Sequence, residues 1–191
     1  AHAYLFTGSR GTGKTTCAKI LAMALNCKHP AGGNPCLECE SCREIANDET
    51  TDIVELDAAS NSGVSDVHEL QDQLAYTPVS CKYRVYILDE VHMLSTAAFN
   101  ALLKTIEEPP AHVIFILATT ELHKVPATIL SRCQRFEFRR IEIADSSARL
   151  LSIARQEGVS LTQEAADMIS RLSDGGMRDA LSLLDRCIAV S

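Results

Sequence analysis

The sequence predicts an α/β fold in which helices flank a parallel sheet, followed by a small all-helical domain. Three observations point to it. Apolar runs typical of strands alternate with stretches of helical periodicity, these runs are apolar enough to be buried on both faces, and only helical patterns occur toward the C-terminal end. We therefore predict one domain over residues 1–142 and a second over residues 143–191.

The first strand is expected at residues 4–7, where a short apolar run stops at Gly8. A helix should follow, because apolar side chains then recur at helical spacing: Cys17, Leu21, Ala24 and Leu25. Next comes an insert rich in cysteine and glycine, residues 27–42. Residues 52–57 then have the pattern of a second strand.

A further helix is expected at residues 66–76, with Pro78 beyond its end. The third strand is expected at residues 84–89 and the fourth, apolar throughout, at residues 113–119. Residues 133–138 have the pattern of a fifth strand.

The clearest helix is predicted at residues 95–107. Ser95 can cap its N-terminal end, and Pro109 and Pro110 cannot continue it. Four apolar side chains share one of its faces: Phe99, Leu102, Leu103 and Ile106.

Three helices are expected beyond residue 142, each from apolar side chains at helical spacing. Thr162 can cap the second, and Gly175 with Gly176 separates it from the third. The apolar positions are Leu150, Leu151 and Ala154 in the first helix, Ala165, Met168, Ile169 and Leu172 in the second, and Met177, Leu181, Leu184 and Ile188 in the third.

The composition excludes several classes of protein. The chain has 191 residues, of which 46% are hydrophobic, enough for a core. Its net charge of −7 excludes a strongly basic nucleic-acid-binding protein, although one face could still contact DNA. The longest apolar run, residues 113–118, is far shorter than the roughly 20 residues that a membrane-spanning helix needs, so no membrane role is expected.

The N-terminal residues, Ala1 to Tyr4, carry neither an initiator methionine nor a secretory signal. We expect the chain to begin inside a longer protein and to work in the reducing cytoplasm. Its eight cysteines are then not expected to form structural disulfides.

The strongest functional motif lies at residues 8–15, which match the phosphate-binding loop G-x-x-x-x-G-K-[ST] between a strand and a helix. Glycines let backbone amides surround a phosphate, and the N-terminal end of the helix adds partial positive charge. Lys14 would contact the β- and γ-phosphates, and Thr15 would offer its hydroxyl to Mg²⁺. The residues expected to bind nucleotide are Gly8, Ser9, Arg10, Gly11, Thr12, Gly13, Lys14, Thr15 and Thr16.

The third expected strand ends in two carboxylates, Asp89 and Glu90. Ligands of open α/β sheets bind at the carboxyl ends of the strands. Asp89 would therefore hold Mg²⁺, and Glu90 would orient and activate a water molecule on the γ-phosphate, which favours hydrolysis over phosphate transfer. His92 is interpreted as a packing residue at the start of a helix rather than a catalyst.

Four cysteines in the insert have the spacing of a metal site. Cys36, Cys39 and Cys42 form C-x₂-C-x₂-C, and Cys27 precedes them. Four thiolates close a tetrahedral structural zinc site, which leaves no position open for catalysis. An iron–sulfur cluster and a redox disulfide remain alternatives, although the fourth cysteine before proline that is usual for iron–sulfur ligation is absent from this stretch.

Four further residues carry weaker signals. Thr119 and Thr120 end the fourth strand, where a hydroxyl would lie near the attacking water. Arg132 is consistent with an ordinary surface arginine. Arg178 could reach a γ-phosphate or simply pair with one of two neighbouring carboxylates, Asp174 or Asp179.

With these residues in place, the whole chain resembles the ATPase core of bacterial clamp loaders, the AAA+ family of DNA polymerase III gamma and tau subunits. The most specific shared feature is the four-cysteine insert directly after the phosphate-loop helix. The other matching stretches are residues 89–94, 99–104, 107–110, 131–133 and 178–183.

The resemblance implies a P-loop AAA+ sheet of five parallel strands in the order 5-1-4-3-2, followed by a lid of three helices. It implies that Thr120 is the sensor-1 residue, with Thr119 an adjacent candidate. It also implies that Arg178 is a sensor-2 arginine and that Arg132 is an arginine finger acting on ATP held by a neighbouring subunit.

The implied function is that of an ATP-hydrolysing motor subunit in the DNA polymerase III holoenzyme. It would use ATP binding and hydrolysis to open the sliding clamp and load it on primed DNA. The implied cofactors are ATP, Mg²⁺ and Zn²⁺, and the partners are the other subunits of a hetero-pentamer, the sliding clamp and primed DNA. Family members also have a base-contacting segment before the first strand and a C-terminal collar, so this segment alone is expected to be monomeric.

Two alternatives belong to other classes. A structural arm subunit of a replication or checkpoint complex would bind ATP without hydrolysing it, which the intact Lys14, Thr15, Asp89 and Glu90 argue against. A different P-loop DNA motor, such as a DExH-type helicase, would need a second RecA-like domain where only helices are predicted.

Overall fold

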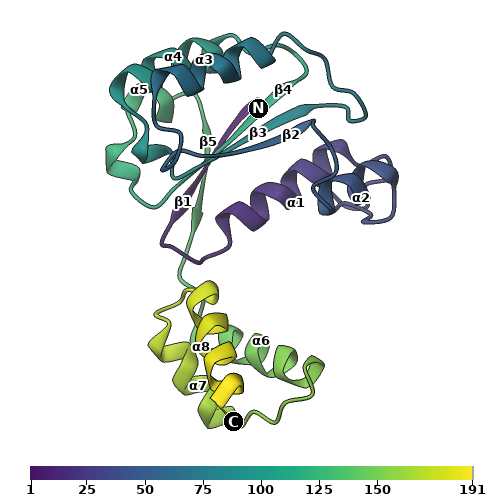
Figure 1. Cartoon of the computed structure of the whole chain (residues 1–191), viewed down its shortest axis with the longest axis vertical. Helices are drawn as coiled ribbons and strands as arrows, with labels where there is room; N and C mark the ends of the chain where they lie inside the picture. The colour runs from purple at the N-terminus through teal and green to yellow at the C-terminus, as the bar shows by residue number, and fades with distance from the viewer. Residues whose placement is uncertain (191) are drawn as a thin grey trace. The chain divides into compact units, whose positions relative to one another are not determined.

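The computed structural model describes residues 1–190 (Figure 1). The chain divides into two compact units. The first comprises residues 1–7 and 14–137, and the second comprises residues 8–13 together with the chain from residue 138 onward. The expected boundary near residue 142 stays a prediction.

The sheet has five strands in the order β2-β3-β4-β1-β5. The strand pairs β1–β4, β3–β4 and β2–β3 are parallel. These results confirm the predicted α/β fold and the strand order 5-1-4-3-2. The strands are β1 (Ala3–Gly8), β2 (Ile53–Asp57), β3 (Arg84–Asp89), β4 (Val113–Thr119) and β5 (Gln134–Phe138).

Burial follows the position of each strand in the sheet. Every residue of the central strand β4 is buried, whereas the edge strand β5 is largely exposed. Between β3 and β4 the rings of Tyr86 and Phe115 stack with centroids 5.6 Å apart, at the middle of the hydrophobic core. This explains why the run at residues 113–118 is uninterrupted by polar side chains: helices cover both of its faces.

The helices of the first unit lie on both faces of the sheet. Figure 1 shows α3, α4 and α5 on one face and α1 and α2 on the other. Gln71 of α3 donates hydrogen bonds to the carbonyl of Ala101 and the hydroxyl of Thr105 on α4, at 2.9 and 2.8 Å. The helices are α1 (Lys14–Asn26), α2 (Glu40–Ala46), α3 (Val64–Gln73), α4 (Thr96–Glu107) and α5 (Ala127–Leu130), with short 3₁₀ turns η1 (Val91–Met93) and η2 (Leu122–Lys124).

Local sequence signals predicted some helix ends correctly and others less accurately. Ser95 caps α4 as predicted, since its hydroxyl accepts a hydrogen bond from the amide of Ala98 at 3.2 Å. Helix α3 starts two residues before the expected position and ends at Gln73 instead of Tyr76. The short helices α2 and α5 were not expected, because a helix of four to seven residues gives too few apolar repeats to be recognised.

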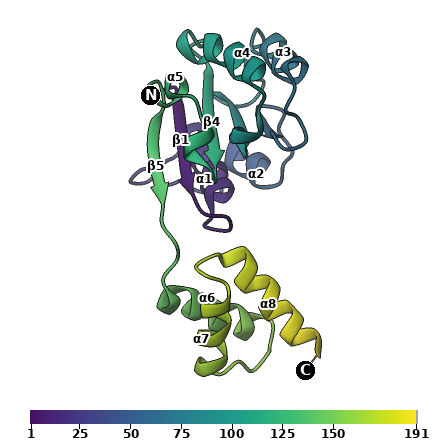
Figure 2. The same ribbon diagram turned by 90° about the vertical axis from the view of Figure 1, so that its left-hand side faces the viewer.

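The helical part of the second unit consists of α6 (Ile143–Gln156), α7 (Gln163–Leu172) and α8 (Met177–Val190), seen in a second view in Figure 2. This confirms the predicted three-helix segment. The hydroxyl of Thr162 caps α7 by accepting from the amide of Ala165 at 3.3 Å. The core of these helices is formed by Leu150, Ala166, Ile169, Ala180 and Leu184. None of the described helices is long and apolar enough to cross a membrane.

A buried carboxylate organises the loop before β3. Asp52 is completely buried and accepts hydrogen bonds from three successive amides, those of Val79, Ser80 and Cys81, at 2.8–3.0 Å. Burial raises the pKa of this carboxyl, but the three amides and the charge of Arg84 lower it by more, so its pKa lies below the ordinary value. The loop therefore depends on an ionised Asp52.

Replacing Asp52 by asparagine should lower the free energy of unfolding by about 2 kcal/mol at pH 7, because a buried charged acceptor of three amides is lost. Urea unfolding measures this value. The matched control is Asp48→Asn, whose carboxylate is exposed and pairs with Lys19, and which should change stability by less than about 1 kcal/mol.

The pH dependence has a defined sign. Because the pKa of Asp52 is lower in the folded chain, its contribution is complete above the unfolded pKa of about 3.9 and is lost as the pH falls through the folded pKa. The stability gap between the native chain and Asp52→Asn should therefore narrow only in strong acid. An equal gap at all pH values, or equal effects of the two substitutions, would contradict this role.

Candidate functional site

The phosphate-loop motif forms a close turn against the start of α8 within the second unit. Gly8 has φ +147°, and a Cβ built there would lie 2.2 Å from the carbonyl oxygen of Phe138. Gly11 has φ +77°, and its carbonyl accepts a hydrogen bond from the amide of Met177 at 2.9 Å. Only glycine fits both positions without strain. At these two positions of the motif, the backbone conformation therefore requires glycine.

The next two motif residues begin α1. Lys14 is buried, and the hydroxyl of Thr15 donates to Oδ2 of Asp89 at 2.5 Å. Oδ1 of Asp89 accepts from the amide of Glu90 at 2.9 Å, which fixes the carboxylate at the end of β3. A hydroxyl and a carboxylate oxygen held together are ligands that suit Mg²⁺. Thr15 and Asp89 are therefore the pair that could hold this ion.

Glu90 has an unusual backbone and three polar neighbours. Its φ of +47° lies in the left-handed region, which is uncommon for a residue other than glycine. Its Oε2 accepts from the hydroxyl of Thr120 at 2.9 Å and from the amide of Thr120 at 3.3 Å. Nδ1 of His92 lies 3.3 Å from the same oxygen. The structure thus brings together Glu90 and Thr120, two of the residues expected at the site.

The two adjacent threonines have different surroundings. The hydroxyl of Thr119 accepts from the amide of Glu121 at 3.0 Å and lies 3.1 Å from Nδ1 of His92. Thr119 is completely buried, whereas Thr120 is partly exposed beside Glu90. The geometry favours Thr120 over Thr119 as the residue that could reach a water molecule held by Glu90.

Sequence reasoning missed the polar role of His92. It lies in η1 at the start of a helix, as expected, but its ring is held between carboxylates on both sides. Nε2 lies 3.3 Å from Oε1 of Glu121, on the segment after β4. Its position two residues after Glu90 was visible in the sequence, but its partners depend on the pairing of β3 with β4. His92 links the ends of these two strands.

Arg132 is the second residue after α5, and its polar contacts are with α4, α5 and Ser131. Its guanidinium donates to the carbonyl of Thr128 at 2.8 Å and to the hydroxyl of Ser131 at 3.2 Å, and it pairs with Oε1 of Glu107 at 2.5 Å. Within residues 1–190 it makes no hydrogen bond or ion pair to Asp89, Glu90 or Thr120. The structure therefore does not bring Arg132 into the cluster at the ends of β3 and β4.

Arg178 is the second residue of α8 and lies beside the phosphate loop. A Cβ built on Gly11 would lie 3.5 Å from the Cβ of Arg178. In the part of the chain that the structure describes, Arg178 makes no ion pair, and Asp174 pairs with Arg140 instead. Of the two alternatives left open for Arg178, the pairing with Asp174 or Asp179 is therefore not formed within residues 1–190, and the contact with a γ-phosphate stays a prediction.

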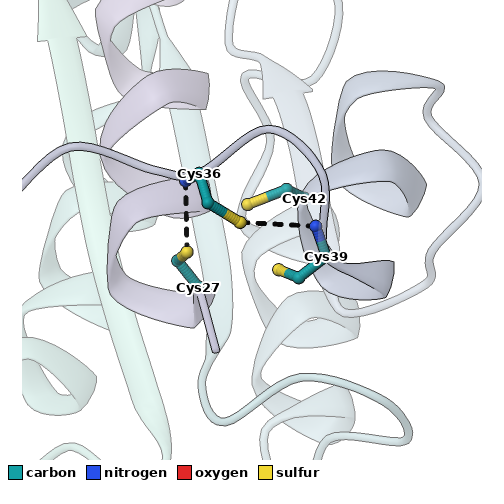
Figure 3. Close-up of side chains that lie close together, drawn as sticks. All are labelled: Cys27, Cys36, Cys39 and Cys42. Carbon is teal, nitrogen blue, oxygen red and sulfur yellow. Dashed lines mark hydrogen bonds between the residues drawn. The ribbon is translucent and has the colours of Figure 1, made fainter. Parts of the chain in front are cut away.

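The four cysteines of the insert converge. The sulfur atoms of Cys27, Cys36, Cys39 and Cys42 all lie within 4.8 Å of one another (Figure 3). Four thiolates on one zinc ion would be about 3.8 Å apart, from a Zn–S distance of about 2.3 Å in a tetrahedron. The insert is thus folded into a cluster that could hold a metal ion, as its spacing predicted.

Backbone amides surround these sulfur atoms. The amides of His29 and Cys36 donate to Cys27, and the amide of Cys39 donates to Cys36. Chiefly because the amide of Lys28 donates to its sulfur, Cys39 has its pKa lowered to about 6. Burial raises the pKa of Cys42 to about 12, and a bound cation would reverse that effect. The donor set therefore suits a metal that binds thiolates.

All eight cysteines are free thiols, in agreement with the expectation of no structural disulfides. Those outside the insert are dispersed. Cys17 and Cys133 are half-buried, Cys187 is exposed, and Cys81 packs against the cluster formed by Met23, Cys42 and Ile45.

Two family models match the chain. One, described as "DNA polymerase III, delta subunit", matches residues 1–142. The other, described as "DNA polymerase III clamp loader subunit, ATPase lid domain", matches residues 146–191. Together they account for nearly the whole sequence.

Curated relatives agree with these matches. The chain is 53% identical over its full length to DNA polymerase III subunit tau of Bacillus subtilis (strain 168), of which the match covers 34%. It is 46% identical over 98% of its length to DNA polymerase III subunit tau of Escherichia coli (strain K12), of which the match covers 29%. The chain thus spans about a third of the length of these relatives.

Solved structures share the fold at lower identity. The RuvB Holliday junction branch migration motor of Thermotoga maritima has a TM-score of 0.66 at 22% identity, over 97% of this chain and 54% of that one. A DNA polymerase III gamma subunit-related protein of Thermotoga maritima has a TM-score of 0.64 at 19% identity, over 96% of this chain and 52% of that one. These likenesses show the AAA+ P-loop fold alone.

Proposed function

The chain belongs to the clamp-loader family of DNA polymerase III, and from that premise we propose that it is the ATP-hydrolysing core of a clamp-loader motor subunit. Residues 1–142 are the nucleotide-binding domain and residues 143–191 are the lid. The observation that carries the proposal is the cluster at the ends of β3 and β4, where Thr15 meets Asp89 and Thr120 meets Glu90. A clamp-loader subunit that only bound ATP would not need an ordered Glu90.

ATP is proposed to be bound by the phosphate loop and the first residues of α1, which follow one another in the chain. The loop amides and the N-terminal end of α1 would surround the phosphates, and Lys14 would neutralise charge on the β- and γ-phosphates. Mg²⁺, held by Thr15 and Asp89, would stabilise the charge that develops on the phosphates. Arg178, beside Gly11, would contact the γ-phosphate.

Glu90 is proposed to orient and activate the attacking water. Its Oε2 is already occupied by the hydroxyl and amide of Thr120. A water molecule donating one hydrogen bond to Glu90 and a second to the hydroxyl oxygen of Thr120 would be held between two fixed groups. Thr120 would thereby act as the sensor that responds to the γ-phosphate.

Hydrolysis is proposed to need a neighbouring subunit. Arg132 makes its contacts away from the cluster of its own chain, which suits a residue that completes the ATP site of the next subunit. ATP would then join the subunits of a hetero-pentamer that opens the sliding clamp and places it on primed DNA. Hydrolysis would release that arrangement, so that the γ-phosphate shifts the population between two states.

Zinc is proposed as the metal of the four-cysteine cluster. Four thiolates without an open position are typical of a structural zinc site. The ion would join the end of α1 to the start of α2, because Cys27 follows α1 and Cys42 lies within α2. Its role would be structural rather than catalytic.

Glu90→Gln should reduce DNA-stimulated ATP hydrolysis by at least about 10²-fold in the full-length subunit within its complex, because the general base is lost. Binding of ATP should remain, since the phosphate loop is unchanged. The measurement is steady-state phosphate release beside nucleotide binding. Glu137→Gln, an exposed glutamate on β5, is the control and should behave like the native protein.

A single-turnover measurement of ATP hydrolysis distinguishes an ATP-hydrolysing motor subunit from a structural arm subunit that only binds ATP. If the native subunit binds ATP in the complete complex but does not hydrolyse it in one turnover, the present proposal is wrong. The subunit would then be a structural arm that binds ATP without hydrolysing it. Intact turnover in Glu90→Gln would contradict only the role of Glu90.

Protein purified without added metal should contain close to one zinc ion per chain by elemental mass spectrometry. Cys36→Ser should lose most of that zinc, because one of four thiolates is removed, whereas Cys187→Ser should keep it, since that thiol lies on the exposed face of α8. Iron in place of zinc, or equal metal content in the two variants, would contradict the assignment.

A further inference from the structure

Among the polar contacts of Arg132 within residues 1–190, the ion pair with Glu107 is the one that comes from α4, whereas the others lie in or just after α5. Glu107 is the last residue of α4, and its Oε1 lies 2.5 Å from the guanidinium. We propose that Glu107 is a positioning residue that fixes the direction in which Arg132 meets the ATP of the neighbouring subunit. This inference rests on the proposed trans role of Arg132.

The base of the arginine side chain is already fixed. Ile129 is completely buried and anchors α5 in the core, and its carbonyl accepts a hydrogen bond from the amide of Arg132 at 3.0 Å. Backbone position alone does not orient a long side chain, which keeps several rotatable bonds. Further contacts are needed to hold the guanidinium itself.

Three acceptors supply those contacts, one in α4, one in α5 and one just after α5. One terminal nitrogen donates to Thr128 and Ser131 on the side of α5, and the other pairs with Glu107 of α4. Because a guanidinium is planar, acceptors on two sides define its plane. Its Nε makes no hydrogen bond within residues 1–190, so that edge stays available for a phosphate oxygen of a neighbouring nucleotide.

The advantage of the pair is orientation rather than attraction. The side chain of Glu107 is 39% exposed and that of Arg132 is 37% exposed, a setting in which ion pairs add little to stability. A carboxylate beside the arginine also weakens its attraction for a triphosphate, because the pair is neutral overall. Removing Glu107 should therefore slow the chemical step without weakening the binding of ATP.

The location of Glu107 argues against a purely structural role. Carboxylates at the C-terminal end of a helix are opposed by the helix dipole. Glu108, the next residue, is equally exposed and makes no ion pair in the described part of the chain. Glu108 is therefore a suitable control for Glu107, because it differs in having no ion pair with Arg132.

The test compares Glu107→Ala with Glu108→Ala in the full-length subunit, assembled with its partner subunits, the sliding clamp and primed DNA. Glu107→Ala should lower kcat about tenfold with an unchanged or lower KM for ATP. Without Glu107, the guanidinium of Arg132 samples several directions and is rarely oriented toward the neighbouring ATP. Glu107→Gln keeps an acceptor oxygen and should lose about threefold. Glu108→Ala should match the native complex. Both alanine variants should keep or raise the melting temperature.

A double-mutant cycle with Arg132→Ala decides whether Glu107 acts through the arginine. In the Arg132→Ala background, Glu107→Ala should have no further effect. The inference is overturned if Glu107→Ala resembles Glu108→Ala, or if it lowers kcat by the same factor with and without Arg132. If Arg132→Ala itself leaves turnover intact, the proposed trans role of Arg132 is wrong. The positioning role of Glu107 is then wrong as well, because it rests on that role.

Discussion

The parallel pairing of β3 with β4 is the constraint on which the rest of the site depends. Leu88 pairs in register with Leu117, so that the polar residues following each strand emerge side by side. Asp89 and Glu90 end one strand and Thr119 and Thr120 end the other. Glu90 accepts from the hydroxyl of Thr120 at 2.9 Å, whereas Asp89 accepts from the hydroxyl of Thr15 on α1 at 2.5 Å. Both strands are buried, so this register is strongly specified by the core. A slip by one residue would separate the groups.

The same end of the sheet contains a non-glycine residue with a left-handed backbone. Glu90 is held in the left-handed region, which costs roughly 1–2 kcal/mol in a non-glycine residue. The hydrogen bonds from Thr120 and the contact with His92 hold it there. Backbone strain of this kind is typical of functional sites, where it orients a side chain at a cost in stability. Here it orients the carboxylate of Glu90.

Much of this arrangement could be predicted from the sequence, and the remainder could not for identifiable reasons. The strands, the cap of α4 and the cysteine cluster follow from local patterns, because burial, capping and ligand spacing act within a few residues. The strand order came from a family resemblance. The contacts of His92 and Glu107 depend instead on which strands and helices become neighbours, and local patterns do not encode that.

Helices α1 and α2, which flank the cysteine insert, contact a different part of the sheet from the strand end that holds Asp89 and Glu90. Lys19 of α1 pairs with Asp48, just after α2, and with Glu55 of the edge strand β2. Ser80, held by Asp52 before β2, donates to Glu44 of α2. Helix α1, helix α2 with the residues after it, and the edge of the sheet are therefore joined by polar contacts. A metal ion in the insert would tighten those contacts from outside, whereas Asp89 and Glu90 are held by the buried strands β3 and β4. Loss of the metal should thus loosen the edge at β2 before it disturbs the carboxylates.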